Sequence, residues 1–190
     1  LIGIYISGHP LDSYRIIVED VCNMRMTQLE DKVAFANQDV FLGGIVTDVR
    51  MGQTRTGKPY GIAKLEDYSG AGEIALFGED WAKFSGYFHV GNSLYITARV
   101  EERQWQQGAY ELKIGRIEFL SDVKDQKIKS ITINVATEKL TLEIVNELAS
   151  IIRKSPGPTD VFFNILDNDE HSQVMLQSKL CHVSVYSLLI

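Results

Sequence analysis

Five runs of residues between positions 39 and 119 decide the fold of this chain. They are VFLGGIVTDVRM (40–51), YGIAKLED (60–67), EIALF (73–77), SLYITARVEERQW (93–105) and YELKIGRIEF (110–119). Apolar and polar residues alternate most clearly from Leu94 to Glu101, and a period of two is typical of a strand with one buried face. The first run contains Gly43 and Gly44, which predict a bulge or a sharp bend. We therefore expect five short strands.

The segments between these runs predict how the strands connect. A polar turn with Gly57 and Pro59 joins the first two strands, a tight turn at 69–72 joins the next two, and a short helix is expected at 79–88. The last two strands meet across a hairpin at 106–108. Three strands, a helix and a hairpin follow one another in the chain order of an OB-fold, a five-stranded Greek-key barrel that binds oligonucleotides through its second and third strands and hairpin loops.

The rest of the chain predicts two further parts. Residues 1–38 read as a helical connector, with a helix over 11–18, and the absence of an initial Met suggests a piece of a longer protein. Residues 121–127 are rich in charge and predict a linker. Beyond them we expect a strand at 130–136, a helix capped by Thr137, and strands at 161–166 and 172–176. The predicted fold class is mainly β with α: an OB-fold barrel at 39–120 and a small α+β (βαββ) unit at 121–190.

Composition and charge limit the class of protein. The chain has 190 residues, 45% of them hydrophobic, and a formal net charge of −6. It has no apolar run of the roughly 18 residues that a membrane helix needs. Cys22 and Cys181 lie far apart in sequence without a paired Cys or His, which is typical of reduced thiols in a cytoplasmic protein. The negative charge disfavours a dedicated nucleic-acid binder.

Local charge points the other way at the first hairpin. From position 49 to 65 there are four basic residues and no acidic one: Arg50, Arg55, Lys58 and Lys64. A basic loop that projects from a barrel can contact phosphates. It can equally be a solvated hairpin tip, and the sequence leaves both readings open.

Aromatic rings and cations on the outward faces of the strands are the candidate nucleic-acid contacts, because bases stack on rings while cations follow the phosphates. The candidates are Arg55, Lys58, Tyr60, Lys64, Phe77, Arg99, Arg103, Trp105, Tyr110 and Lys113. Phe77 has an alternative role as a plug of the barrel. Trp81, Tyr87 and Phe88 are expected in the core.

No catalytic or metal site is predicted, and no cofactor. The pairs of adjacent carboxylates, such as Glu66 and Asp67, lie on strands, where neighbouring side chains point to opposite faces. The four histidines show no spacing typical of metal ligands.

The run GIYISGHPLDSY (3–14) resembles the GLYLSGHPLDxY signature of the alpha subunits of bacterial DNA polymerase III. The runs GGIVTDVR (43–50), TGKPY (56–60) and LEDYSG (65–70) resemble the OB-fold pattern that follows this signature in the family. The resemblance implies an OB module of a replicative polymerase that binds single-stranded DNA, with the catalytic carboxylates elsewhere, in the palm.

Two other functions remain open. The chain could be a protein–protein scaffold that holds a polymerase to the sliding clamp or to the clamp-loader subunit tau, and the negative net charge favours this alternative. A barrel from an aminoacyl-tRNA synthetase or a nuclease complex is disfavoured by the run SGHPLD (7–12).

Overall fold

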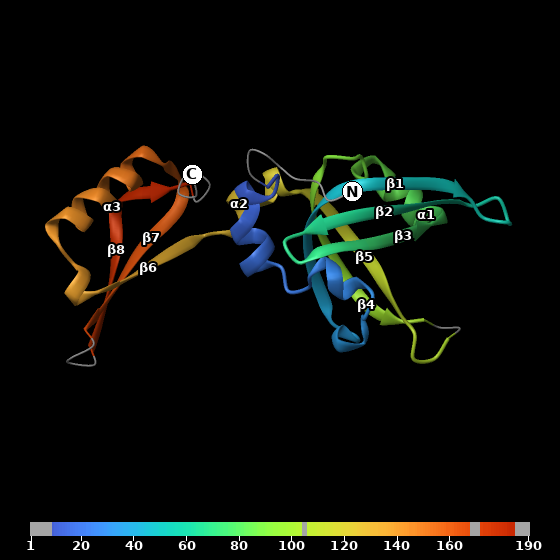
Figure 1. The fold of residues 1–190 in the computed structure, drawn as a ribbon, viewed down its shortest axis with the longest axis horizontal. Helices are drawn as coiled ribbons and strands as arrows, with labels where there is room; N and C mark the ends of the chain where they lie inside the picture. Colours follow the sequence, from blue (N-terminus) through green and yellow to red (C-terminus); the bar gives the residue numbers. More distant parts are fainter. Residues whose placement is uncertain (1–8, 104–105, 168–171, 185–190) are drawn as a thin grey trace. The chain divides into compact units, whose positions relative to one another are not determined.

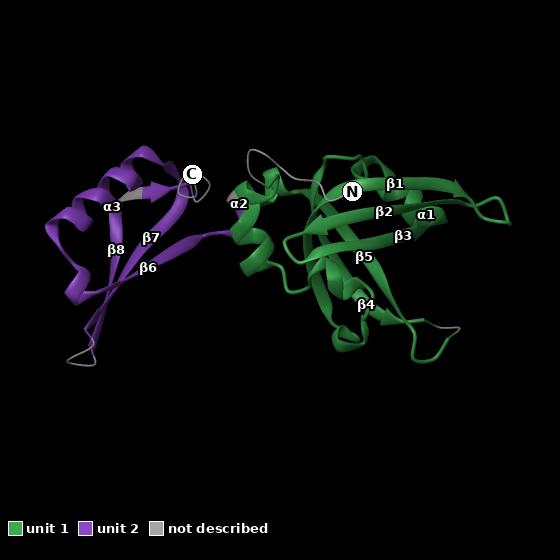
Figure 2. Cartoon of the chain, in the orientation of Figure 1, with its two compact units in different colours: residues 1–123 green, residues 124–190 purple. Residues whose placement is uncertain are grey.

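The computed structural model describes residues 9–103, 106–167 and 172–184. It divides the chain into two units, residues 1–123 (unit 1) and 124–190 (unit 2), shown in Figure 2. Within the described residues, no helix has the length and apolar character that crossing a membrane requires.

Unit 1 contains the five-stranded sheet that the sequence predicts. The strands are β1 (Asp39–Gln53), β2 (Pro59–Asp67), β3 (Gly70–Phe77), β4 (Ser93–Glu102) and β5 (Tyr110–Phe119), and they lie in the order β3-β2-β1-β4-β5 (Figure 1). All neighbouring strands are antiparallel. Helix α1 (Gly78–Phe84) and the 3-10 turn η5 (Ser85–Tyr87) connect β3 to β4, where the helix was expected. The fold is therefore the predicted OB-fold.

β1 bends between two partners, but the irregularity in it is not where the glycines predict it. Gly43 and Gly44 pair in regular register with β4, and the register shift falls at Thr47. The glycine pair therefore forms no bulge, while the alternative of a sharp bend there stays a prediction. The glycines instead allow the N-terminal segment to pack closely against β1, since a Cβ on Gly44 would lie 2.7 Å from the methyl carbon of Met26.

The alternating pattern of β4 correctly predicts its buried face. Leu94, Ile96 and Val100 are each fully buried. Tyr95, on the opposite face, is also only 1% exposed. That second face is covered because the N-terminal segment packs over β1 beside it: a Cβ on Gly43 would lie 3.1 Å from the Cys22 sulfur.

Trp81 of α1 closes one end of the barrel, as predicted. It is 7% exposed and belongs to the same buried cluster as Phe88, with Tyr87 packed against that cluster. Gly61 on β2 makes room for the indole, because a Cβ at Gly61 would lie 2.3 Å from the ring.

The predicted helix over 11–18 corresponds to a continuous helical stretch at 12–21. This stretch consists of the 3-10 turn η1 (Asp12–Tyr14), two α-helical residues at 15–16 and the π-helical turn η2 (Ile17–Val21). The 3-10 turns η3 (Met26–Leu29) and η4 (Val33–Phe35) follow it. Met26 and Leu29 of η3 join the buried cluster of the barrel.

Two carboxylates hold the N-terminal segment to the turn between β2 and β3. The buried carboxylate of Asp67 accepts hydrogen bonds from the backbone N–H of Met26 (2.9 Å) and of Ser69 (2.8 Å). Asp12 accepts a hydrogen bond from the Tyr68 hydroxyl (3.0 Å), and the His9 and Tyr68 rings lie 4.9 Å apart. His9 and Asp12 both belong to the SGHPLD run, so this run contributes to the contact.

Unit 2 has the predicted βαββ order. β6 (Ser130–Ala136) is followed by the 3-10 turn η6 (Thr137–Lys139), α3 (Leu142–Lys154), β7 (Pro156–Asp167) and β8 (Ser172–Val183). The sheet order is β6-β7-β8, with β6 parallel and β8 antiparallel to β7. Its small core contains Ile152, Val161 and Val183.

One local prediction for this part of the chain was wrong and another lacked an element. Residues 121–127, predicted as a linker, contain the boundary between the two units and form helix α2 (Leu120–Lys127). Thr137 does not cap α3, because Thr141 does: its hydroxyl accepts a hydrogen bond from the Ile144 backbone N–H at 3.3 Å.

Candidate nucleic-acid interface

Two aromatic rings lie side by side on the outward face of β2 and β3. Tyr60 and Phe77 are cross-strand partners, and their ring centroids are 5.8 Å apart. Phe77 is 55% exposed, so it faces solvent and does not plug the barrel. We call Tyr60 and Phe77 the aromatic pair.

Gly52 of β1 extends the flat surface beside the aromatic pair. It is the cross-strand partner of Tyr60, and a Cβ at this position would lie 2.8 Å from the Tyr60 hydroxyl oxygen. Tyr60 therefore leans over β1, and only a residue without a side chain leaves room for the ring in this position.

The cations in the middle of this face already form ion pairs with neighbouring carboxylates. Arg50 forms ion pairs with Glu73 and, at 3.7 Å, with Asp48. Lys64 pairs with Glu66 at 3.3 Å. Such exposed pairs contribute about 0–1 kcal/mol each. A phosphate can displace these carboxylates, but the free energy of binding gained is smaller than at a cation without a carboxylate partner.

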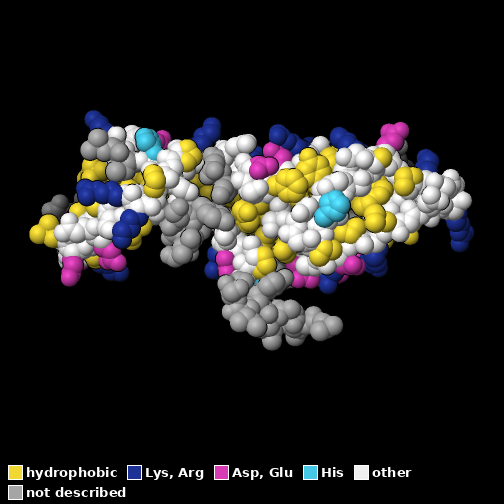
Figure 3. All heavy atoms as spheres, turned by 90° about the horizontal axis from the view of Figure 1, so that it is seen from above, with side chains coloured by type: hydrophobic (Ala, Val, Ile, Leu, Met, Phe, Trp, Pro, Cys, Tyr) yellow, Lys and Arg dark blue, Asp and Glu magenta, His cyan; other side chains and the backbone are white. Residues whose placement is uncertain are grey.

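The hairpin between β1 and β2 carries free cations. The backbone N–H of Thr54 donates to the Lys58 carbonyl at 2.8 Å, and Gly57 adopts the positive φ of 78° that the turn requires. Arg55 and Lys58 are exposed, and within the described residues neither forms an ion pair. Figure 3 shows Lys and Arg side chains at this end of unit 1. We call residues 53–59 the basic hairpin.

The basic hairpin and the aromatic pair lie at the same end of the sheet. Tyr60 directly follows the hairpin, and Phe77 is its cross-strand partner. A Cβ on Gly78, the residue after Phe77, would lie 3.9 Å from Cδ of Lys58. Cations and rings are therefore close enough for one short strand to contact both.

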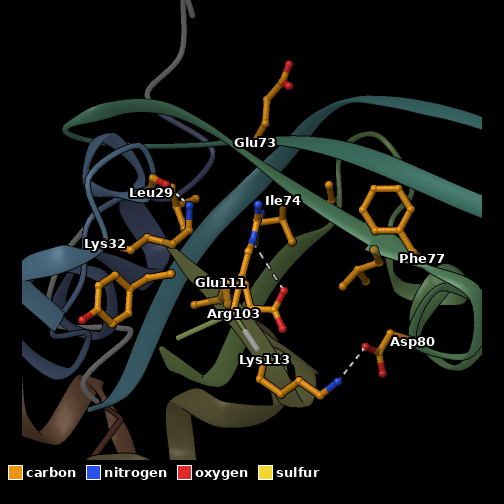
Figure 4. Close-up of a pocket in the computed structure, with 13 residues that line it drawn as sticks. Leu29, Lys32, Glu73, Ile74, Phe77, Asp80, Arg103, Glu111 and Lys113 are labelled. Atoms are coloured by element: carbon orange, nitrogen blue, oxygen red, sulfur yellow. Dashed lines mark hydrogen bonds and ion pairs between the residues drawn. The ribbon is translucent and has the colours of Figure 1, made fainter. Parts of the chain in front are cut away.

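A groove of about 390 Å³ lies between the two edge strands of the sheet, β3 and β5. It brings four of the predicted residues together: Phe77, Arg103, Tyr110 and Lys113. Arg103 pairs with Glu111 at 3.6 Å, and Lys113 pairs with Asp80 at 3.4 Å. Figure 4 shows these pairs in the groove, while Glu73 points away from it. Phe77 lines the groove and also belongs to the β2–β3 face, so the two surfaces are continuous.

Lys32 also lines the groove, although it was not among the predicted residues. It lies between η3 and η4, outside the strands of the barrel. Burial, followed by the positive charge of Arg103, lowers the pKa of Lys32, while Glu30 partly opposes this shift. No pattern in the sequence marks this lysine, because only the packing of the N-terminal segment brings it to β5.

One of the predicted residues does not join this site, and another cannot be placed. Arg99 on β4 pairs with Asp39 at 2.9 Å and does not line the groove. Trp105 lies outside the described residues. The described residues contain no group of three His, Cys, Asp or Glu side chains that could hold a metal ion.

Two family models match the chain. Residues 40–120 match the model of the OB-fold nucleic acid binding domain, and residues 131–190 match that of the DNA polymerase III alpha subunit, C-terminal domain.

The similar curated proteins are DNA polymerase III alpha subunits. That of Borreliella burgdorferi is 25% identical over 185 residues, which cover 95% of this chain and 16% of that protein. That of Bacillus subtilis is 25% identical over 161 residues, which cover 85% of this chain and 14% of that protein. The chain thus spans about one sixth of the length of these relatives.

Two solved structures also match. The second OB-fold domain of replication protein A from Methanococcus maripaludis is 16% identical, with a TM-score of 0.29, over 44% of this chain and 85% of that one. A replication protein A heterotrimer bound to ssDNA is 19% identical, with a TM-score of 0.32, over 71% of this chain and 34% of that one. At TM-scores this low, neither structure adds to the assignment. By the family models and the curated relatives, the chain corresponds to the OB-fold and C-terminal domain region of DNA polymerase III alpha subunits.

Proposed function

We propose that unit 1 binds single-stranded DNA as a module of a replicative DNA polymerase in the cytoplasm. The observation that carries this proposal is the aromatic pair, with Phe77 55% exposed next to a hairpin whose cations have no carboxylate partners among the described residues. Stacking of a base on an aromatic side chain contributes roughly 1–3 kcal/mol. The hairpin cations supply the phosphate contacts that such a stack requires.

The ion pairs of the barrel limit the expected affinity. Arg50, Lys64 and Arg103 each have a carboxylate partner, so Arg55 and Lys58 provide most of the free positive charge on this surface. For single strands, log K falls with log[salt] with a slope of about −0.7 for each phosphate neutralised. We expect a slope of about −1.4 for the two hairpin cations. Raising the salt concentration from about 50 to about 150 mM should therefore weaken binding about fivefold.

Fluorescence anisotropy with labelled oligo-dT tests the proposal. The double variant Arg55→Ala, Lys58→Ala should bind more weakly than the wild type and have a shallower salt dependence. The matched control is Arg116→Ala, Lys83→Ala, which removes the same charge from other parts of unit 1. Equal loss in both double variants would show a bulk charge effect and would contradict a specific interface at the hairpin.

A second candidate function is a scaffold that contacts the sliding clamp or the clamp-loader subunit tau. The net charge of −6 and the neutralised cations of the barrel favour it. So does an apolar groove of about 380 Å³ in unit 2, between α3 and its sheet. Its lining includes Val145, Leu148 and Phe163.

Binding of purified clamp or tau, measured by calorimetry in parallel with the oligonucleotide titration, separates the two functions. Val145→Asp places a charge in the apolar groove of unit 2 and should abolish a protein contact made there, while oligo-dT binding remains. Binding of either protein without any binding of oligo-dT would favour the scaffold over the DNA-binding module.

A further inference from the structure

One cation in the groove between β3 and β5 has no carboxylate partner among the described residues. The Lys32 ammonium donates a hydrogen bond to the Leu29 carbonyl and forms no ion pair there. The three acidic residues at the groove are engaged with other cations: Glu111 with Arg103, Asp80 with Lys113, and Glu73, whose carboxylate points out of the groove, with Arg50. The groove therefore holds one positive charge that its own residues do not balance.

Lys32 and Arg103 are near enough for their charges to repel. The Arg103 charge and burial together lower the pKa of Lys32. Figure 4 shows the ends of both side chains within the groove. Two neighbouring cations in a partly desolvated groove are unfavourable unless an anion offsets them.

Arg103 also has an unused donor. Its Nε is shielded from solvent and has no hydrogen-bond partner in the described structure, because the Glu111 carboxylate lies at 3.6 Å, beyond hydrogen-bond range. Buried donors are rarely left without an acceptor. The Arg103 side chain as a whole is 41% exposed, so a bound anion can reach the other N–H donors of the guanidinium.

We propose that this groove holds a phosphodiester of a single strand between Lys32 and Arg103. The inference rests on the proposed function, which it extends from the β2–β3 face into the groove. Phe77 connects the two surfaces, since it belongs to the aromatic pair and also lines the groove. A base stacked on Phe77 places its neighbouring phosphate at the groove. The volume of about 390 Å³ lies within the range of small-ligand pockets.

The test compares two lysines of the same groove in the full chain. Lys32→Gln removes the unpaired cation, and Lys113→Gln removes one that Asp80 already compensates. By anisotropy with labelled oligo-dT at several KCl concentrations, Lys32→Gln should weaken binding about three- to tenfold at low salt and make the slope shallower by about 0.7. Lys113→Gln should have less than about a twofold effect. Lys32→Arg, which keeps the charge, should retain binding, and circular dichroism verifies that each variant is folded.

The outcomes separate this proposal from the proposed function. If the hairpin double variant weakens binding but Lys32→Gln changes neither affinity nor slope, the groove proposal is wrong and the DNA-binding function stands. If the wild type does not bind oligo-dT, the proposed function is wrong, and the groove proposal falls with it.

A second measurement distinguishes a strand phosphate from a free one. The Arg103 Nε–H resonance in ¹⁵N NMR spectra should shift when oligo-dT is added, and inorganic phosphate or pyrophosphate should compete only weakly. A shift with pyrophosphate and none with oligo-dT would overturn the phosphodiester assignment in favour of a free phosphate site.

Discussion

Phe77 faces solvent over more than half of its surface, at 55% exposure, although large apolar side chains are usually buried. Its contact with Tyr60 is made on the outside of the sheet, so replacing it removes little of the core. We expect Phe77→Ala to weaken oligo-dT binding by about 5–20-fold, which corresponds to the loss of one stacking partner. The free energy of unfolding should change by less than about 0.5 kcal/mol.

Phe119 offers a control for this prediction. It is a partly exposed ring on β5 that contacts Tyr87 at 5.5 Å and does not line the groove. Anisotropy should detect almost no change in oligo-dT binding for Phe119→Ala. Similar losses for both variants would mean that stacking at Phe77 is not specific.

Cys22 predicts a pH dependence of stability. Burial raises the pKa of its thiol to about 12. In the unfolded chain a cysteine loses its proton near pH 8.5. As the pH rises above this value, the unfolded state releases a proton that the native state retains, so the free energy of unfolding falls.

Urea unfolding at pH 7.5 and at pH 10 measures this effect. The wild type should lose stability between the two values, and Cys22→Ala, which has no thiol at this position, should lose less. Burial also raises the pKa of Tyr95, to about 12, but an unfolded tyrosine titrates near pH 10, so Tyr95 contributes mainly at higher pH. An equal loss in Cys22→Ala and the wild type would contradict the assignment to Cys22.

At the scale of single elements, the N-cap of α3 is the clearest prediction. Thr141→Ala removes the hydrogen bond to the Ile144 backbone N–H and should destabilise unit 2 by about 1 kcal/mol. Thr137→Ala should have a much smaller effect, because Thr137 lies in η6, before the helix. Hydrogen exchange of the first amides of α3 compares the two variants. Faster exchange in Thr137→Ala than in Thr141→Ala would contradict the assignment of the cap.

Elements with one buried face could be predicted from the sequence, whereas those defined by tertiary packing could not. β4 and β5 follow from their alternation. Residues 121–127 looked like a linker because they are highly charged, yet Leu120 and Val123, one turn apart in α2, are 0% and 1% exposed. Two buried residues in a short polar segment are too weak a signal for a helix.

The same distinction applies to the candidate site. Strand parity places Tyr60, Lys64 and Phe77 outward, as the sequence predicts. The ion pairs that neutralise Lys64 and Arg103 could not be predicted, because they depend on side-chain distances in the folded sheet. Lys32 could not be predicted either, because it comes from a segment that has no place in the strand pattern.

For the whole molecule, the separate cores predict separate unfolding. The buried cluster of unit 1 extends over all five strands, whereas that of unit 2 comprises, among the described residues, Ile152, Val161 and Val183. Stability grows with the apolar area that a unit buries. We expect unit 2 to unfold at lower urea concentration than unit 1, in two transitions that residue-resolved NMR follows. A single coincident transition for amides of both units would contradict this prediction.

The contact between η3 and the barrel limits where the protein can be truncated. Met26 and Leu29 fill space beside Gly44 and Gly72, and the Met26 N–H satisfies the buried Asp67 carboxylate. A shortened version that starts at β1 would expose apolar surface and leave a desolvated charge without one of its donors. The smallest autonomous folding piece of unit 1 therefore starts well before its first strand, and sheet boundaries alone are the wrong guide to where it can be cut.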